Sequence, residues 1–315
     1  MIGYVARRLL ALIPLLFIIS FVVFGMTLLV PGDPAIEIAG GINAEPADVA
    51  RVREELHFNE PVLVQYGYWL RDAVHGDLGQ SYLRNSSVTD ELQRRIPVTL
   101  SMALGALFVT VMLGLPAGII AGTRPRSPRD RGVTVASSVG VALPDFWLAT
   151  IFVVWFAVDL GWFPAQGYVP PAESVTEWAK HLVLVWFALG IAGAASFARQ
   201  LRGALIDTLE QDYIRTAQAK GAGKRRVVYK HALKNASFIP ITVLGLQFAY
   251  LLGGTVILEY IFSLNGIGGY FYTALVSRDI PVIQGVTLFV AVTFVVVNLV
   301  IDLVYGYLNP KVRLA

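Results

Sequence analysis

Cysteine is absent from this chain of 315 residues, and charged residues make up only 15% of it. The absence of cysteine excludes disulfides, thiolate metal sites, iron–sulfur clusters and cysteine nucleophiles. Soluble globular domains contain roughly 25% charged residues, so the low charge content argues against an ordinary soluble protein. A net charge of +3 is too small to indicate nucleic acid as a partner.

The residues needed for catalysis or nucleotide binding are also missing. In the stretch GAGKRR at 221–226, Arg225 stands where a phosphate loop has Ser or Thr, and Gln218 stands where it has its first glycine. No nucleophile–base set is recognisable, and the four histidines lack the spacing of metal ligands: His57, His75, His181 and His231. We therefore predict that the chain is not an enzyme and binds no ATP, metal or other cofactor itself.

Hydrophobic residues make up 56% of the chain, and its mean hydropathy is +0.62. A helix that crosses the hydrocarbon core needs about 20 predominantly apolar residues. The chain is predicted to be an all-α integral membrane protein with six transmembrane helices. The predicted spans are Leu9–Val30, Val98–Gly122, Val133–Leu160, Leu182–Ala198, Ala236–Leu258 and Val282–Leu308.

The distribution of Lys and Arg indicates how the spans are oriented. With both termini inside, the cytoplasmic segments hold 17 of the 25 Lys and Arg residues. Six of the remaining eight lie in one long segment, where the positive-inside rule is weakest. The sequence therefore predicts an N-in, C-in topology in a bacterial cell membrane.

The long segment between the first two spans, Pro31–Ile96, is predicted to be folded and external. It contains two predicted helices, Pro46–Phe58 and Pro61–Val74. In the second helix one face is expected to be shared by Leu63, Gly67, Leu70 and Val74.

Glycine recurs every four residues in the second span, at Gly114, Gly118 and Gly122. Small residues at this spacing allow helices to approach closely in lipid. We predict tight helix packing along this stripe.

Two acidic residues fall inside predicted spans. Asp145 lies about 12 residues, or about 18 Å, into the third span, which places it near the bilayer midplane. Charges at that depth are costly, so Asp145 either lies on a translocation path or has a structural partner. Asp302 lies nearer the cytoplasmic end of the sixth span, and a structural role is expected.

The most charged stretch among the predicted spans is Leu209–Ser237, LEQDYIRTAQAKGAGKRRVVYKHALKNAS. Gly221 and Gly223 are expected to break it into two short helices. One side of the first helix is predicted to contain Tyr213, Ala217 and Ile214, and the apolar side of the second contains Val227, Val228 and Leu233. The apolar sides are expected to lie on the membrane surface or in a groove of another protein.

This stretch resembles the cytoplasmic "EAA loop" of permease subunits of binding-protein-dependent ABC importers, with Arg215-Thr216-Ala217 at the EAA positions. Further stretches resemble the first, or B-type, permease of the dipeptide and oligopeptide branch: YVARRLLALIP, LVPGDP, GDLGQSY, PVTLSMAL, LPDFWLA, EYIFSLNGIGG and RDIPVIQG. The chain departs from the family at Asn265, where a proline is usual, and at His231 and Lys234, where the general loop has isoleucine and proline.

The resemblance implies a type I importer permease fold, with an N-terminal helix and external segment at 1–96. A permease core at 97–315 then carries the EAA-type loop at 199–235. Implied partners are a homologous second permease, two ATPase subunits that use ATP and Mg, an extracytoplasmic peptide-binding protein and membrane lipid. The implied cargo is a dipeptide or oligopeptide, or another small solute such as nickel or glutathione.

The resemblance also assigns roles to residues. The loop residues expected to couple to an ATPase are Tyr213, Arg215, Thr216, Ala217, Lys220, Gly221, Lys224 and Arg225. Candidates for the translocation path are Asp145, Phe146 and Gln247, and structural or gating candidates are Asp33, Glu259, Asn265, Gly266 and Asp302.

Three alternatives to this assignment remain. The basic loop can instead be one that is attracted to anionic lipid. Asp145 and Asp302 would suit a secondary transporter driven by protons or sodium, although the inverted repeats typical of such folds are not evident. A membrane scaffold without transport activity is the third alternative.

Overall fold

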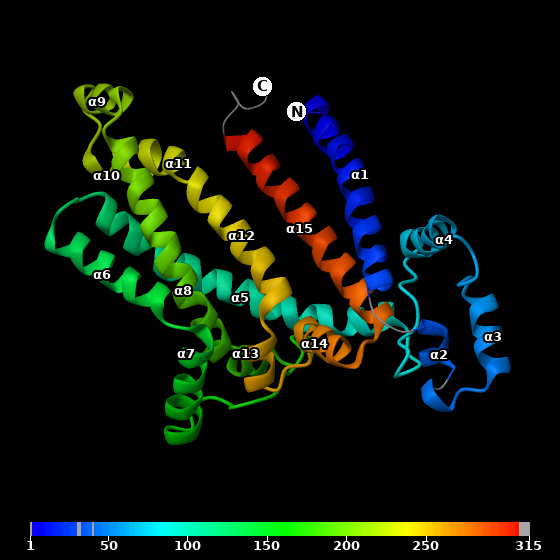
Figure 1. Ribbon diagram of the computed structural model, residues 1–315. Helices are drawn as coiled ribbons and strands as arrows, with labels where there is room; N and C mark the ends of the chain where they lie inside the picture. The colour runs from blue at the N-terminus through cyan, green and yellow to red at the C-terminus, as the bar shows by residue number, and fades with distance from the viewer. Residues whose placement is uncertain (1, 30–32, 40, 309–315) are drawn as a thin grey trace. The chain divides into compact units, whose positions relative to one another are not determined.

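The computed structural model describes residues 2–29, 33–39 and 41–308, which form helices joined by loops (Figure 1). Among these residues there is no β-strand, only an isolated bridge between Gln80 and Ser87. The helices group into two compact units. We call residues 98–265 and 297–308 the core unit, and residues 2–97 and 266–296 the N-terminal unit.

Four helices are long and apolar enough to cross a membrane alone. They are Arg7–Leu28, α5 (Val88–Gly122), α8 (Val175–Leu209) and the stretch Ile280–Gly306 of α15 (Ile280–Leu308). Two further pairs of helices reach that length only when taken together, with bends of 94° and 53°. The predicted all-α membrane architecture is confirmed, whereas six spans and their orientation stay predictions.

The N-terminal unit contains both of the helices predicted for its polar segment. Its elements are α1 (Ile2–Gly25), η1 (Met26–Leu29), α2 (Pro34–Ile38), η2 (Gly41–Asn43), α3 (Pro46–Glu55), α4 (Val62–Val74), α14 (Ile267–Ser277) and the first parts of α5 and α15. Proline is the first residue of α3, where its missing N–H costs nothing because the first N–H groups of a helix have no partner.

The side of α4 that packs on α1 is not the one that carries Leu63 and Val74. Leu63 and Val74 are 70% and 76% exposed. The aromatic side chains on the other side pack on α1, where the rings of Tyr66 and Trp69 lie 5.6 and 5.8 Å from that of Phe24. Aromatic rings offer a large apolar contact area, which explains why α4 packs on α1 through Tyr66 and Trp69.

The core unit is built around α5 and α8. Its other elements are α6 (Pro128–Ala142), α7 (Asp145–Phe152), the π-helix η3 (Val153–Asp159), α9 (Asp212–Ala219), α10 (Lys224–Arg226), the π-helix η4 (Val227–Ala232), α11 (Leu233–Ala236), α12 (Phe238–Gly254) and α13 (Val256–Ile261). Helix α8 begins seven residues before the predicted fourth span because Ser174 caps it, accepting a hydrogen bond of 3.2 Å from the N–H of Glu177.

The predicted third span is not one continuous helix, and whether its two helices form one span stays a prediction. The helix ends at Ala142, Leu143 is extended (φ −78°, ψ 126°), and α7 restarts at Asp145 after a 94° bend. Pro144 explains the break because a proline disfavours helical backbone at the preceding residue. The predicted fifth span, Ala236–Leu258, is likewise interrupted.

Two breaks divide that fifth span. The first lies between α11 and α12, where the ring of Pro240 would clash with the carbonyl of Ala236 four residues earlier in a continuous helix. The chain bends there by 53°. The second break lies at Thr255, between α12 and α13.

The glycine stripe of α5 packs against α8, as predicted. A Cβ atom added to Gly114 would lie 2.9 Å from the backbone oxygen of Ala194, and one added to Gly118 would lie 2.9 Å from the Cβ of Leu201. At Gly122 the distance to the Cβ of Leu205 would be 2.8 Å. Any side chain at these positions would therefore force the two helices apart.

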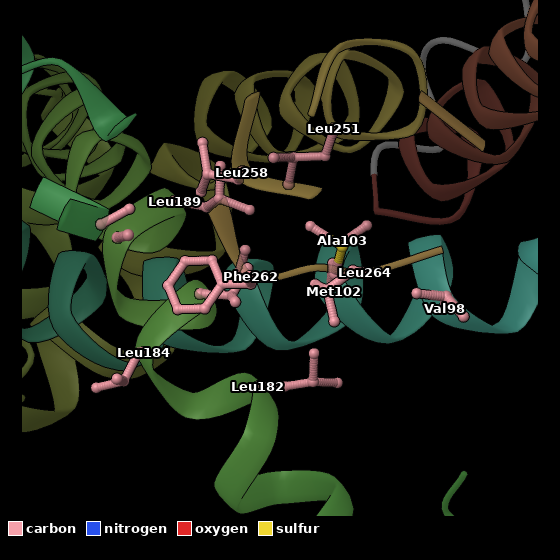
Figure 2. Packing of buried hydrophobic residues seen from close by; sticks show 14 of the residues in the cluster. Val98, Met102, Ala103, Leu182, Leu184, Leu189, Leu251, Leu258, Phe262 and Leu264 are labelled. Atoms are coloured by element: carbon pink, nitrogen blue, oxygen red, sulfur yellow. The ribbon is translucent and has the colours of Figure 1, made fainter. Parts of the chain in front are cut away.

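The contact between α5 and α8 continues from Gly114 toward the start of α5. Gly105 makes room for the indole of Trp186, whose Nε1 donates a hydrogen bond of 2.9 Å to the carbonyl oxygen of Ser101. Around it lies a buried apolar cluster, in which α5 contributes Val98, Met102 and Ala103 and α8 contributes Leu182, Leu184 and Leu189 (Figure 2). Phe262, 1% exposed, fills the space between these helices.

A buried ion pair joins the start of α6 to α8. The guanidinium of Arg202 donates through Nε and Nη2 to both carboxylate oxygens of Asp130, with an Nη2–Oδ2 distance of 2.9 Å. The backbone N–H of Arg126 donates a third bond of 2.7 Å to the same carboxylate. The carboxylate is buried, so these donors replace the water that it loses.

Replacing Gly114 with Ala is expected to lower the free energy of unfolding by about 1–3 kcal/mol, because the new methyl group meets the backbone of α8. Thermal unfolding in a mild detergent measures the change. Gly203→Ala in α8 is the matched control, since nothing lies within 4 Å of an added Cβ there. Equal stability of the two variants would contradict close packing of α5 on α8.

Replacing Arg202 with Gln is expected to cost about 3 kcal/mol of stability, because it leaves the Asp130 carboxylate buried with one donor fewer than it needs. We place the loss at the low end of the range for broken buried pairs because the side chain of Arg202 is 31% exposed. Arg199→Gln, the same change on an exposed site of α8, serves as the control in denaturant titrations. A similar loss in both variants would rule out the ion pair as the cause.

Candidate coupling loop

The basic loop between α8 and α12 folds as two short helices joined by a glycine turn. Helix α9 ends at Ala219, and Gly221 adopts φ +85°, as expected for the residue that terminates a helix. The N–H of Gly221 bonds to Gln218 O at 2.9 Å, and the N–H of Ala222 bonds to Ala217 O at 3.1 Å. These two bonds form a Schellman turn, which determines how the chain leaves α9.

The base of the loop is buried in the core unit itself. Ile214 of α9 is fully buried and Val227 is 2% exposed. Both belong to a cluster with Leu201 and Leu205 of α8. The expectation that the apolar side of the loop needs an external surface was therefore wrong for Ile214, because the end of α8 already covers it.

A polar contact closes the loop on the other side of α9. The side-chain amide of Asn235 donates hydrogen bonds to the hydroxyl of Tyr213, at 2.8 Å, and to the carbonyl of His231, at 3.1 Å. The ring of Tyr213 is nevertheless 43% exposed. Asn235 was missed by the sequence analysis, because nothing in the linear pattern pairs it with a residue 22 positions away.

The residues predicted to contact an ATPase all lie in this loop, at the end of the core unit opposite α7 (Figure 1). Ala217 is half-buried, and the other seven are exposed: Tyr213, Arg215, Thr216, Lys220, Gly221, Lys224 and Arg225. Arg215 forms an exposed ion pair with Asp212 at 3.3 Å, which contributes little stability. The loop therefore has an exposed outer end, formed by these residues and called the tip below, on a buried base.

The three translocation-path candidates occupy different surroundings. Asp145 is the first residue of α7 and accepts a 2.8 Å hydrogen bond from the N–H of Phe146, so it lies at the start of a helix and not inside a continuous one. The cause is the break at Pro144. The depth of Asp145 in the membrane stays a prediction. Phe146 is 45% exposed.

Gln247 on α12 lies against the α5–α8 pair. Its Nε2 donates to the hydroxyl of Thr110 at 3.0 Å, and that hydroxyl donates to the carbonyl of Gly190 at 3.2 Å. A Cβ at Gly193 would collide with the Gln247 amide. In this chain Gln247 therefore links α12 to α5 and, through Thr110, to α8. Its role on the translocation path stays a prediction.

The structural candidates of the core unit lie near α13 and on α15. Glu259 is 1% exposed and accepts a 3.1 Å hydrogen bond from the hydroxyl of Thr255, which belongs to the break between α12 and α13. Asn265 is exposed, and Asp302 is half-buried on α15.

In the N-terminal unit, Asp33 and Gly266 each stand at the start of a helix. Asp33 accepts a 3.0 Å bond from the N–H of Ala35 in α2 and forms an ion pair with Arg53 of α3. Gly266 precedes α14 as its N-cap residue. These contacts are local, and the gating role of both residues stays a prediction.

Another residue missed by the sequence analysis is Asp279 of the N-terminal unit. It accepts hydrogen bonds from the hydroxyl of Ser81, at 2.5 Å, and from the N–H of Tyr82, at 3.2 Å. Burial and the Asp279 carboxylate both raise the pKa of Tyr82. The contact joins the stretches GDLGQSY and RDIPVIQG, which the sequence separates by almost 200 residues.

Comparison with known proteins agrees with these features along the whole chain. Residues 114–314 match the family described as "binding-protein-dependent transport system inner membrane component", and residues 1–103 match the N-terminal part of such components. The dipeptide transport system permease protein DppB of Alkalihalophilus pseudofirmus is 39% identical over 333 residues, covering 99% of this chain and 100% of that protein. The glutathione transport system permease protein GsiC of Escherichia coli O6:H1 is 40% identical over 314 residues, covering 99% of both chains.

A solved structure shares the fold. The structure superimposes on a chain of the MetNI methionine ABC transporter, solved in inward-facing conformations, with a TM-score of 0.55. The match covers 70% of this chain and 96% of that one, at 19% identity. With the family match over most of its length, this chain belongs to the binding-protein-dependent transport system inner membrane components, the multi-pass permeases of ABC importers.

Proposed function

We propose that this chain is the first permease of an importer for dipeptides or oligopeptides. It pairs with a homologous second permease to form the pathway, and an extracytoplasmic binding protein delivers the peptide. Two ATPase subunits bind ATP and Mg and hydrolyse the ATP, while this chain catalyses no reaction. Relatives named for dipeptide and glutathione transport support a peptide-like cargo, since glutathione is itself a small peptide.

The observation that carries the proposal is the construction of α9. Its base, Ile214, is packed against α8, so α9 cannot move independently of that helix. Its outer residues, including Tyr213, Thr216 and Lys220, are exposed and free to contact another protein. A short helix with an anchored base and an exposed tip transmits displacement from an ATPase to the transmembrane helices.

Electrostatics at the tip favours an acidic partner surface. Lys220, Lys224 and Arg225 are exposed, and none of them forms an ion pair among the described residues. A cationic rim around an apolar contact at Tyr213 and Ala217 is the arrangement expected of a docking site, in which aromatic anchors contribute most of the affinity. The rim increases the association rate and the specificity.

Replacing Ala217 with Arg is expected to reduce ATP-dependent peptide uptake by more than tenfold, because a long charged side chain would displace the ATPase from the tip. Uptake of a radiolabelled dipeptide into vesicles containing all partners is the measurement. Gln218→Arg adds the same side chain at an exposed neighbour in α9 and should retain uptake. Normal uptake with Ala217→Arg would contradict coupling through α9, and competition by glutathione would identify the alternative cargo.

The predicted orientation can be tested because the chain contains no cysteine. Gln218→Cys creates a single thiol on α9 and is expected to react with a membrane-impermeant maleimide only in inside-out vesicles. Glu55→Cys, at the exposed end of α3, is the opposite control and should react only in intact spheroplasts. Labelling of Gln218→Cys from outside would reverse the topology and exclude an ATPase site on the loop.

A further inference from the structure

Two adjoining hollows lie beside the second half of the basic loop, both within the core unit. The first is open and cationic, lined by Gly223, Lys224, Arg225, Arg226, Tyr229 and Lys230. The second has a volume of about 320 Å³ and is lined mainly by apolar side chains of α5, α8 and α12, among them Leu115, Phe197, Leu201, Ile241 and Leu244. Tyr229 lines both hollows, so they adjoin at this residue.

The bend between α11 and α12 places these hollows at a boundary between polar and apolar sequence. The helical stretch Lys224–Ala236 is basic, whereas Phe238–Gly253 contains no charged residue and together with it qualifies as a membrane span. Tyr229 is 56% exposed close to this boundary, and tyrosine is enriched at the level of lipid headgroups. We therefore expect the cationic hollow at headgroup level and the apolar groove at acyl-chain level.

The cations beside the groove have no partner in the described chain. Arg226, Lys230 and Lys234 recur every four residues and lie beside the two hollows. None of them forms an ion pair among the described residues, and no Asp or Glu is among the described residues lining either hollow. A ligand of this site must bring both negative charge and an apolar body.

We propose that the two hollows together bind one anionic phospholipid. Its phosphate lies between Arg226 and Lys230, and an acyl chain passes Tyr229 into the groove along Leu244. A free anion would leave the groove empty, and an apolar side chain of another protein would leave the cations unpaired. Lys224 and Arg225, which line the first hollow, also belong to the cationic rim proposed for the ATPase. Arg226, Lys230 and the groove lie outside that rim, so lipid binding there requires only that the chain is embedded in a membrane.

Lipid binding by the purified full chain in a neutral detergent tests the proposal. Native mass spectrometry measures retention of palmitoyl-oleoyl phosphatidylglycerol and of the matching phosphatidylcholine. The wild type is expected to prefer phosphatidylglycerol. The double variant Arg226→Gln/Lys230→Gln should bind it about 25-fold more weakly, at about fivefold for each charge removed, and bind phosphatidylcholine unchanged.

Two further variants distinguish a specific lipid site in the two hollows from general attraction of anionic lipid to the basic loop. Arg215→Gln/Lys220→Gln removes two charges from the same loop outside the hollows and should leave lipid affinity unchanged. Leu244→Trp fills the groove with the cations intact and should weaken binding of both lipids.

Several results would overturn the proposal. Equal affinity for the two lipids, or an equal loss in the control double variant, would show only diffuse attraction. Displacement by glycerol 1-phosphate at the same concentration as the lipid would show an anion site without a chain. A photoreactive residue in place of Ile241 that crosslinks in cell membranes to another protein and not to lipid would show that a partner subunit covers the groove.

Discussion

The close approach of α5 and α8 is the constraint on which the core unit depends. Within a bilayer, lipid tails are as apolar as leucine, so helices associate through tight van der Waals packing rather than through a hydrophobic effect. Glycines at 105, 114, 118 and 122 allow this contact along much of the length of α5. Because α6, α7 and α12 all pack on α8, a shift of α8 would displace each of them.

The interruptions of the helices show how polar groups are accommodated in an apolar chain. An unpaired polar group inside a membrane is costly, so broken helices occur only where the chain itself satisfies the freed groups. Thr255, at the break before α13, donates its hydroxyl to the buried Glu259. At the start of α6, Arg202 and the backbone of Arg126 satisfy Asp130. The break at Thr255 and the start of α6 therefore carry their own internal hydrogen-bond partners.

The loop after α8 combines a rigid base with an exposed surface that differs along its length. The first half, α9, rests on Ile214 and presents the residues proposed to meet an ATPase. The second half, α10 to α11, places unpaired cations beside an apolar groove. In these proposals the loop contacts an ATPase at its tip and the membrane through its second half, so lipid composition would influence how firmly the second half is held.

Sequence alone was sufficient for features that depend on composition or on neighbouring residues: the apolar spans, the glycine stripe, the helices α3 and α4, and the turn at Gly221. Tertiary structure decided which sides of helices are buried. It turned Ile214 inward and Tyr213 outward, and it packed Tyr66 of α4, rather than Leu63, on α1. It also paired residues 72 and 198 positions apart, Asp130 with Arg202 and Ser81 with Asp279. Local patterns describe a helix by itself, whereas partners depend on which helices pack together, and that is settled by the shapes and polar groups of the whole chain.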